Sequence, residues 1–355
     1  MKRLLSLLVC LMLTFALIGC ASDDQSAEDS SAEEETTEEA SDEELSGHLV
    51  IYTSEPQDLA TEMLDDFVSK HPGVTYELYR SGTGDVKTKL DTELEAGGTE
   101  ACILWFADLA YMYDLDDEGL ILHYSPEAVE SVPDAYKYND GMGHEVRAIY
   151  SVLAYNTTQI EEGPEDWDDV TTDDYTGSLA IANPAYSGGA MTTLSVHVEP
   201  DNEDTVGWDW YQALADNDVK MEQSNGTLMT KVSSGEYKGA VIVDYLPRNA
   251  KTEGSPVDYV YPASGSVLIP TPVCLMDTMP EESVDAAKAF VDYMFEVETQ
   301  KLFVEQGYVP IISEAAEGSD VPTIEDIDVL PMDVEYMREN TDSMLTQFSE
   351  MFGTQ

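Results

Sequence analysis

Short apolar runs alternate with amphipathic stretches in the first third of the chain. The apolar runs have the length of buried strands, and the stretches between them repeat apolar residues at helical spacing, as in Leu59, Met63 and Phe67. The predicted order is a strand at 49–52, a helix at 58–70, a strand at 74–79, a helix carrying Val86, Leu90 and Leu94, and a strand at 101–105. Strands and helices that alternate with short connections are typical of a parallel α/β fold.

The rest of the chain continues this mixture of strands and helices. Its predicted elements are a long strand-like run at 147–155, strands at 178–182 and 240–243, extended stretches at 257–261 and 267–276, and helices from 190, at 205–216, 227–234, 284–307 and 333–351. No internal repeat is visible, which excludes a solenoid. A folded part of about 305 residues is long enough for one large domain or two lobes.

The first 20 residues have the pattern of a secretory signal. Lys2 and Arg3 precede an apolar stretch, 4–18, that is too short to span a membrane comfortably, and the segment ends in Gly19-Cys20. This ending is similar to the bacterial lipobox, in which the cysteine is lipidated. It implies an extracytoplasmic protein anchored to the cell membrane through Cys20. The alternative is an ordinary secretory signal with a chance cysteine.

Residues 21–47 form an acidic segment with twelve Asp or Glu and no Lys or Arg. Such a composition cannot bury enough apolar surface to offset chain entropy. We therefore expect a disordered, self-repelling tether between the anchor and the folded part.

The whole chain is strongly acidic, with 72 Asp and Glu against 16 Lys and Arg and a net charge of −56. Like charge excludes nucleic acid and anionic membrane surfaces as partners. A cation-binding function is one interpretation of the acidity. A solvated surface adapted to salty or alkaline surroundings is the other, and it is favoured because the acids are spread along the chain.

Two cysteines, Cys102 and Cys274, lie in apolar strand-like runs of the folded part. Buried free thiols are the expectation, and a disulfide between them is the unsupported alternative. The sequence has no zinc-type cysteine spacing, no nucleophile elbow, no metalloprotease motif and no phosphate-binding Gly-Lys loop, and its five histidines are scattered. Catalysis is therefore not predicted.

The short apolar run at 240–243 ends in Asp244-Tyr245, and Arg248 follows. Because the carboxyl end of a buried strand opens onto the ligand crevice of an α/β protein, Asp244 and Tyr245 are candidates for touching a ligand. The alternative is that Tyr245 packs in the core and Asp244 caps the next turn.

Three predicted helices begin with small polar residues and glycine after a strand. Such starts leave backbone N–H groups open to an anion at the positive end of the helix dipole, although these residue types also serve as plain caps. Two arginines, Arg147 and Arg248, could add positive charge. The residues at the three starts are Ser81, Gly82 and Thr83, then Ser187 and Gly188, then Asn225.

Several short motifs, in this order and spacing, follow one known pattern. They are Tyr52-Thr53-Ser54, the stretches 80–84, 105–108, 153–157, 186–189, 234–237 and 254–257, Tyr261-Pro262, 270–272, 300–303 and 307–310. Together they resemble the solute-binding proteins of ABC importers, in the cluster that holds ferric-ion, thiamine, organophosphate and phosphonate binders. The resemblance covers residues 48–315.

The resemblance implies a type 2 periplasmic-binding-protein fold, in which two α/β lobes joined by hinge strands close on a ligand. It implies lobe 1 at 48–146 and about 264–315, and lobe 2 at 147–263 and about 316–355, with hinge crossings near 147–155 and 261–273. The expected protein is a monomer without a cofactor that delivers a small solute to an importer permease. Ser54 and Asp108 join the residues above as expected ligand contacts.

The ferric binders of this cluster present two adjacent tyrosines where this chain has Asp244-Tyr245-Leu246. One phenolate and one carboxylate are a thin ligand set for Fe³⁺, with Tyr245 as its metal-binding residue. An organophosphate or phosphonate is therefore the first expectation, iron the second and a thiamine-like cation the third. A phosphate-ester hydrolase and a tethered surface protein without a transporter are the competing classes.

Overall fold

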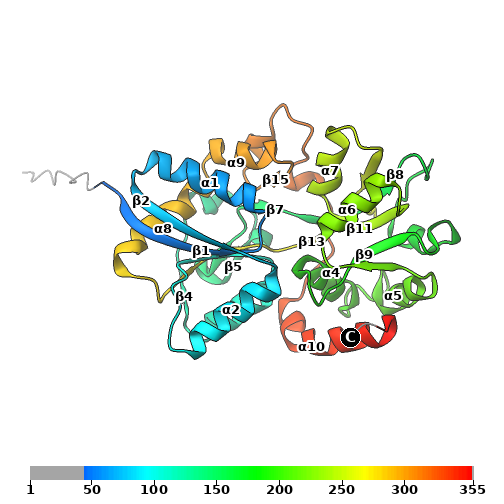
Figure 1. The fold of residues 1–355 in the computed structure, drawn as a ribbon, viewed down its shortest axis with the longest axis horizontal. Helices are drawn as coiled ribbons and strands as arrows, with labels where there is room; N and C mark the ends of the chain where they lie inside the picture. Colours follow the sequence, from blue (N-terminus) through cyan, green and yellow to red (C-terminus); the bar gives the residue numbers. More distant parts are fainter. Residues whose placement is uncertain (1–43, 354–355) are drawn as a thin grey trace, which may run out of the picture. The chain divides into compact units, whose positions relative to one another are not determined.

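The computed structural model describes residues 44–353, and two mixed β-sheets organise this part of the chain (Figure 1). The predicted signal, Cys20 and most of the predicted tether lie outside the described residues. The first sheet has the order β2-β1-β3-β14-β6-β5, with β4 paired to β14. Its strands are β1 (Ser46–Thr53), β2 (Gly73–Arg80), β3 (Ile103–Trp105), β4 (Ile121–Leu122), β5 (Lys137–Tyr138), β6 (Gly143–His144) and β14 (Val273–Met276).

The second sheet has the order β10-β9-β11-β8-β12, with β13 paired to β8. Its strands are β8 (Tyr150–Asn156), β9 (Leu179–Ala182), β10 (Lys220–Glu222), β11 (Gly239–Val243), β12 (Val257–Val260) and β13 (Val267–Leu268). In both sheets the strands joined through helices run parallel and those next to the crossings run antiparallel. This is the predicted α/β class.

Helices cover both faces of the first sheet, and together they form what we call the first lobe. Along β1, Ile51 points into the core that contains Phe67 and Phe290, whereas Tyr52 points into the core that contains Val86. The helices are α1 (Gln57–Lys70), α8 (Glu281–Met294) and α9 (Val297–Glu305) on the first core, and α2 (Thr83–Glu95) and α3 (Leu109–Asp117) on the second.

The second sheet is covered in the same way and forms the second lobe. Every residue of β11 is buried, and its side chains alternate between two cores, with Val241 in one and Ile242 in the other. The helices are α4 (Gly188–Val198) and α5 (Gly207–Asp216) on one face, and α6 (Asn225–Ser234) and α7 (Tyr245–Thr252) on the other. The helix α6 ends where Gly235 adopts a positive φ of 77°, as its position predicts.

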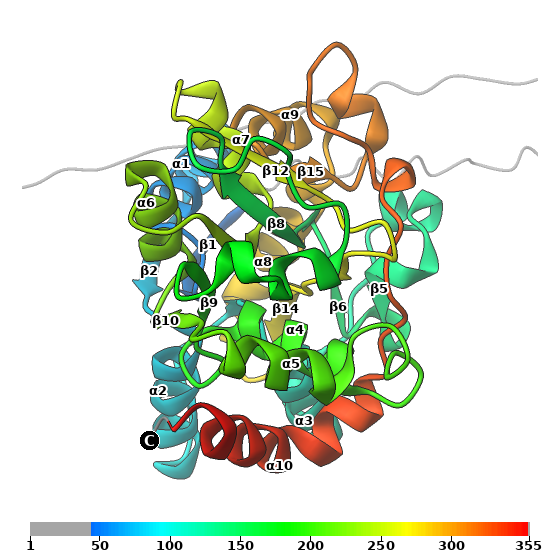
Figure 2. The ribbon, with the colours of Figure 1, turned by 90° about the vertical axis from the view of Figure 1, so that its right-hand side faces the viewer.

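The C-terminal helix α10 (Val334–Phe352) contacts α3 of the first lobe and α4 and α5 of the second (Figure 2). Met344 and Phe348 lie in the core of the second lobe, whereas Arg338 forms an ion pair with Asp114 of α3 at 2.8 Å. The last helix therefore bridges the lobes.

The chain crosses between the sheets twice within the described range. It leaves β6, passes through β7 (Arg147–Ala148), which pairs with β15 (Val309–Pro310), and enters β8. It returns between β13 and β14. The first passage thus lies between His144 and Tyr150 and the second between Leu268 and Val273, and each overlaps one end of an expected hinge stretch, 147–155 and 261–273.

Four predicted boundaries differ from the structure. The run 147–155 is two strands, since β7 and β8 pair with different partners. The helix at 284–307 is interrupted between α8 and α9. The strand β1 begins at Ser46, inside the predicted tether. The strand β13 pairs with the second sheet, although 264–315 was assigned to lobe 1. Three of these differences depend on which strands pair over long distances in the sequence, and the fourth is an interruption of one helix. Local sequence patterns encode neither.

A neutral histidine lies in the core of the second lobe. His197 is fully buried, and its ring packs against Trp167 at 4.5 Å and Trp210 at 5.3 Å between ring centroids. Burial lowers its pKa to about 3. Because a histidine in the unfolded chain has a pKa of about 6.5, the unfolded state binds more protons between these two values. The free energy of unfolding must therefore fall as the pH drops below about 6.5.

We expect His197→Phe to flatten this pH dependence. In the natural protein, protonation linked to His197 lowers the free energy of unfolding by about 2 kcal/mol as the pH falls from 7 to 5. The variant should lack this contribution. Urea unfolding at both pH values measures it. In the control His123→Gln the dependence should not shrink, because contact with Asp116 raises the pKa of that histidine. An unchanged slope in His197→Phe contradicts the assignment.

Candidate functional site

A cleft of about 270 Å³ lies at the carboxyl ends of strands from both sheets. Its lining segments follow β1, β2 and β3 of the first lobe and β9, β10 and β11 of the second, which is the edge where α/β sheets place ligands. The residues that line it are Ser54, Glu55, Pro56, Arg80, Gly82, Thr83, Ala107, Ile149, Tyr186, Ser187, Gly188, Gly189, Gln223, Ser224, Asn225, Gly226, Val243, Tyr245, Ile269 and Thr271.

The start of α4 presents two open backbone donors to the cleft. Ser187 is the N-cap, and its Oγ accepts a hydrogen bond from the backbone N–H of Ala190 at 3.3 Å. Within the described chain, the N–H groups of Gly188 and Gly189 have no acceptor. Both residues line the cleft, so these donors are available to an anion at the positive end of the helix.

The start of α6 repeats this arrangement next to α4. Its N-cap is Ser224, one residue before the predicted start, and the Oγ of Ser224 accepts from the N–H of Thr227 at 3.2 Å. The N–H groups of Asn225 and Gly226 have no acceptor among residues 44–353. The Nδ2 of Asn225 donates to the Oγ of Ser187 at 3.4 Å, which joins the two helix starts.

The start of α2 brings a third set of donors from the first lobe. Gly82 is the N-cap and has no side chain to cap the helix, and the N–H groups of Thr83 and Gly84 have no acceptor in the described part. Ser81 lies beside the cleft without lining it, and its hydroxyl donates to Asp85 at 2.7 Å.

Among the residues that line the cleft, Arg80 is the only one with a positive charge, and it is exposed. The guanidinium of Arg80 donates from Nε to the carbonyl of Glu55 at 2.8 Å and from Nη2 to the carbonyl of Ser54 at 3.3 Å, so it meets backbone oxygens and no carboxylate. The carboxylate of Glu55 is buried and forms an ion pair with Arg147. The only carboxylate among the lining residues is thus neutralised, and the local field favours an anion.

Arg147, predicted as a ligand contact, is fully buried behind the cleft and is not among its lining residues. Besides the ion pair with Glu55, it donates to the hydroxyl of Thr271 at 2.8 Å and lies 4.3 Å from the ring centroid of Tyr308. A second carboxyl nearby, Glu145, has its pKa raised to about 8 by burial. At neutral pH Arg147 therefore has one ionised partner, Glu55.

Tyr245 lines the cleft, and its ring packs against that of Tyr308 with 4.3 Å between the centroids and 31° between the ring planes. Burial, reinforced by the charge of Glu55, raises the pKa of Tyr245 to about 12. The phenol is therefore neutral at physiological pH.

Asp244 and Arg248, also predicted as ligand contacts, are buried, form an ion pair at 2.7 Å and are not among the lining residues of the cleft. The carboxylate of Asp244 also accepts from the hydroxyl of Tyr261 at 2.9 Å and from the N–H of Tyr150 at 3.1 Å. Arg248 donates to the carbonyl of Gly307. Tyr150 and Tyr261 lie next to the two crossings, so these contacts link the pair to the junction of the lobes.

Asp108 is also outside the cleft, contrary to the prediction. It caps α3 through the N–H of Tyr111 and forms an ion pair with Lys87 at 2.6 Å. It lines a separate hollow between α3, α4 and α10.

The structure thus brings together seven predicted residues, namely Ser54, Gly82, Thr83, Ser187, Gly188, Asn225 and Tyr245. Their contact with a ligand stays a prediction. Sequence reasoning missed most of the other lining residues, although Glu55, Arg80, Tyr186 and Ser224 each adjoin a predicted one. That adjacency was the available signal. Thr271 lies in the motif 270–272 of the resemblance, but nothing in the sequence marked it as a residue of the cleft, because only the fold brings the second crossing there.

The two lobes touch at Gly188. A Cβ atom on this residue would lie 2.0 Å from the carbonyl oxygen of Ala107 and 3.1 Å from the Oγ1 of Thr83, both in the first lobe. The start of α4 therefore approaches the first lobe so closely that only glycine fits there.

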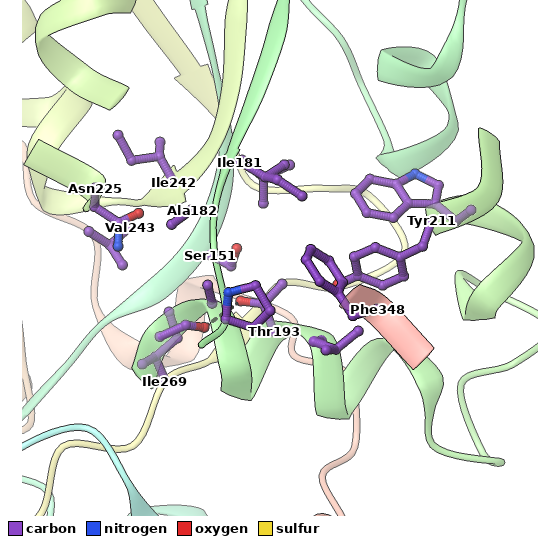
Figure 3. Close-up of a pocket in the computed structure, with 16 residues that line it drawn as sticks. Ser151, Ile181, Ala182, Thr193, Tyr211, Asn225, Ile242, Val243, Ile269 and Phe348 are labelled. Carbon is purple, nitrogen blue, oxygen red and sulfur yellow. Dashed lines mark hydrogen bonds between the residues drawn. The ribbon is translucent and has the colours of Figure 1, made fainter. Parts of the chain in front are cut away.

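A second cavity, of about 30 Å³, lies inside the second lobe between β9, β11, α4 and α5 (Figure 3). Its lining is mostly apolar, with Ile181 and Val243 facing Tyr211 and Phe348. Since about 10–15 Å³ holds one water molecule, this space is too small for an organic solute.

No group of three or more His, Cys, Asp or Glu in the described part is placed to hold a metal ion. Cys102 and Cys274 are buried and free, as predicted. No helix within 44–353 has the length and apolarity needed to cross a membrane.

Comparison with known proteins decides the family. A profile of bacterial extracellular solute-binding proteins matches residues 62–328. The chain belongs to this family. A probable ABC transporter periplasmic-binding protein of Sinorhizobium fredii is 25% identical over 261 residues, which are 71% of each chain.

Solved structures show that this solute-binding protein has the predicted type 2 periplasmic-binding-protein fold. The periplasmic binding protein AfuA of Actinobacillus pleuropneumoniae, with exogenous fructose-6-phosphate bound, has a TM-score of 0.75 at 21% identity, with 86% of this chain and 98% of AfuA covered. Iron-bound HitA of Pseudomonas aeruginosa has a TM-score of 0.72 at 18% identity, with 85% and 99% covered. The chain is thus an extracytoplasmic protein that presents a small solute to the membrane permease of an ABC importer.

We expect Arg147→Met to destabilise this solute-binding protein by about 3–5 kcal/mol, because it leaves Glu55 buried without its partner. Urea unfolding measures the loss. The double variant Glu55→Gln/Arg147→Met removes both charges and should recover a large part of it. A stable Arg147→Met variant that no longer binds solute would contradict the structural role and restore Arg147 as a ligand contact.

We expect Gly188→Ala to hold the lobes apart, because its Cβ meets the carbonyl of Ala107. Spin labels on the two lobes, read by pulsed electron resonance, should report a longer distance than in the natural protein. The matched control is Gly226→Ala at the start of α6, where a Cβ meets nothing closer than 4.0 Å. Equal distances in both variants contradict the role of Gly188.

Proposed function

We propose that this protein is a lipid-anchored solute-binding protein that delivers an organophosphate or phosphonate to its ABC importer. The observation that carries the proposal is the convergence of three helix starts, α2, α4 and α6, on one cleft whose only exposed charged side chain is Arg80. Open N–H groups at helix starts are the usual means of binding phosphate groups. Because the chain as a whole has a net charge of −56, a cleft that favours anions indicates a binding site for an anionic solute.

Apolar side chains beside these donors support a solute with an organic part. Ile149, Val243 and Ile269 line the cleft together with the helix starts. Ligand sites commonly combine such an apolar wall with a few placed polar groups. The bound fructose-6-phosphate of AfuA is a solute of this kind, in a protein of the same fold.

Ferric ion remains the second candidate, favoured by the likeness to iron-bound HitA. The donor set argues against it. Fe³⁺ needs several anionic oxygens, whereas Tyr245 has its pKa raised to about 12 and Glu55 is engaged by Arg147. A thiamine-like cation is third, because it would face the positive ends of three helices. The ion-paired state of Glu55 also supports binding over ester hydrolysis, since no free carboxylate among the lining residues could serve as a base.

A thermal-shift screen of the purified protein tests the proposal. We expect fructose-6-phosphate, glycerol 3-phosphate or methylphosphonate to raise the melting temperature, since a ligand at a hundred times its Kd stabilises the folded state by about 2.7 kcal/mol. Arg80→Gln should weaken this binding by roughly tenfold or more, through loss of a charge-assisted hydrogen bond.

The matched control is Lys301→Gln, which removes an exposed positive charge on α9, away from the cleft. It should leave the affinity unchanged. A shift with ferric citrate that Tyr245→Phe abolishes, together with no response to any phosphate compound, would overturn the proposal in favour of iron.

A further inference from the structure

An exposed aromatic ring stands in the wall of the cleft. Tyr186 is 52% exposed and, with Val329, is one of two exposed large apolar side chains in the described part of the chain. Among residues 44–353, its hydroxyl group has no hydrogen-bond partner and its ring has no aromatic or cationic neighbour. Tyr186 is therefore not held by the core, although it lines the cleft.

A tight turn fixes the backbone under this ring. The carbonyl of Asn183 accepts from the N–H groups of Tyr186 at 3.0 Å and Ser187 at 3.1 Å, and its Oδ1 accepts from Ala185 at 2.9 Å. Ser187 then caps α4, whose first N–H groups open into the cleft. The ring is thus attached directly before an anion-binding helix start.

The size of the cleft indicates what the ring could contact. About 10–15 Å³ of cavity suffices for one water molecule, and this cleft measures about 270 Å³. A lone tetrahedral oxyanion leaves most of that space empty. Aromatic side chains contribute a large contact area at low entropic cost when a partner covers their face.

We propose that Tyr186 is a specificity-determining residue whose ring packs on the organic part of the solute while the helix starts hold its phosphate group. This inference rests on the proposed function and refines it. The protein selects phosphate esters with a carbon framework the size of a sugar, and it discriminates against inorganic phosphate because that ion leaves the ring uncovered.

Isothermal titration of the full protein with fructose-6-phosphate, glycerol 3-phosphate and inorganic phosphate tests this. We expect Tyr186→Ala to weaken the tightest-binding ester by roughly tenfold or more and to change the affinity for inorganic phosphate by less than about twofold. Tyr186→Phe keeps the ring and should keep the ester affinity. Val329→Ala, at the other exposed apolar residue and outside the cleft, should change neither.

The outcomes separate the two proposals. If the natural protein binds an ester but Tyr186→Ala weakens the ester and inorganic phosphate equally, or weakens neither, the role of Tyr186 is wrong and the proposed function stands. If the natural protein binds neither a phosphate ester nor methylphosphonate, both are wrong. If Tyr186→Phe loses the ester as Tyr186→Ala does, the hydroxyl group and not the ring is the contact, which overturns the packing argument.

Discussion

The buried charge of Arg147 is the constraint on which the site depends. A fully buried guanidinium needs an ionised partner, and Glu55 supplies it from the loop after β1. The same side chain binds Thr271 on the second crossing and packs on Tyr308, next to β15. One cation therefore joins four segments that lie far apart in sequence. It also removes the charge of the only carboxylate that lines the cleft, and without that neutralisation an anion would meet a buried negative charge.

An acidic protein that binds an anion has to create a positive potential locally. At a net charge of −56, scattered lysines and arginines would mostly pair with the abundant acids, as Lys87, Lys231 and Arg338 do. Backbone N–H groups at helix starts cannot be neutralised in that way. Their partial charges act over a few ångströms, where solvent screening is weakest. In the proposed function, this explains why three helix starts and a single exposed arginine form the cleft.

The sequence predicted the α/β class and the helix starts because both depend on local patterns, whereas the two-lobed fold was implied by the resemblance. Apolar periodicity located the strands and helices, and glycine with small polar residues located the starts of α2, α4 and α6. The buried charges could not be found in this way. Arg147 and Arg248 were both interpreted as functional. The partner of Arg147, Glu55, lies 92 residues away in sequence, so only the fold brings it near. The partner of Arg248, Asp244, lies one helical turn before it, and there only the fold shows that the pair is buried. Asp244 and Tyr245 are adjacent in sequence, yet one is in the junction and the other in the cleft, since β11 ends at Val243 and α7 begins at Tyr245.

The arrangement of the helix starts also gives a physical reason for closure on a solute. The start of α2 belongs to the first lobe and the starts of α4 and α6 to the second, so bringing the lobes together places like partial charges face to face. In an open form of the cleft, water would satisfy these donors. On closure they lose that water, and only an anion between them satisfies donors from both lobes at once. A solute shifts the balance between open and closed forms by its difference in affinity for the two. In the proposed function that difference comes from the phosphate group, which contacts one lobe in the open form and both lobes in the closed form.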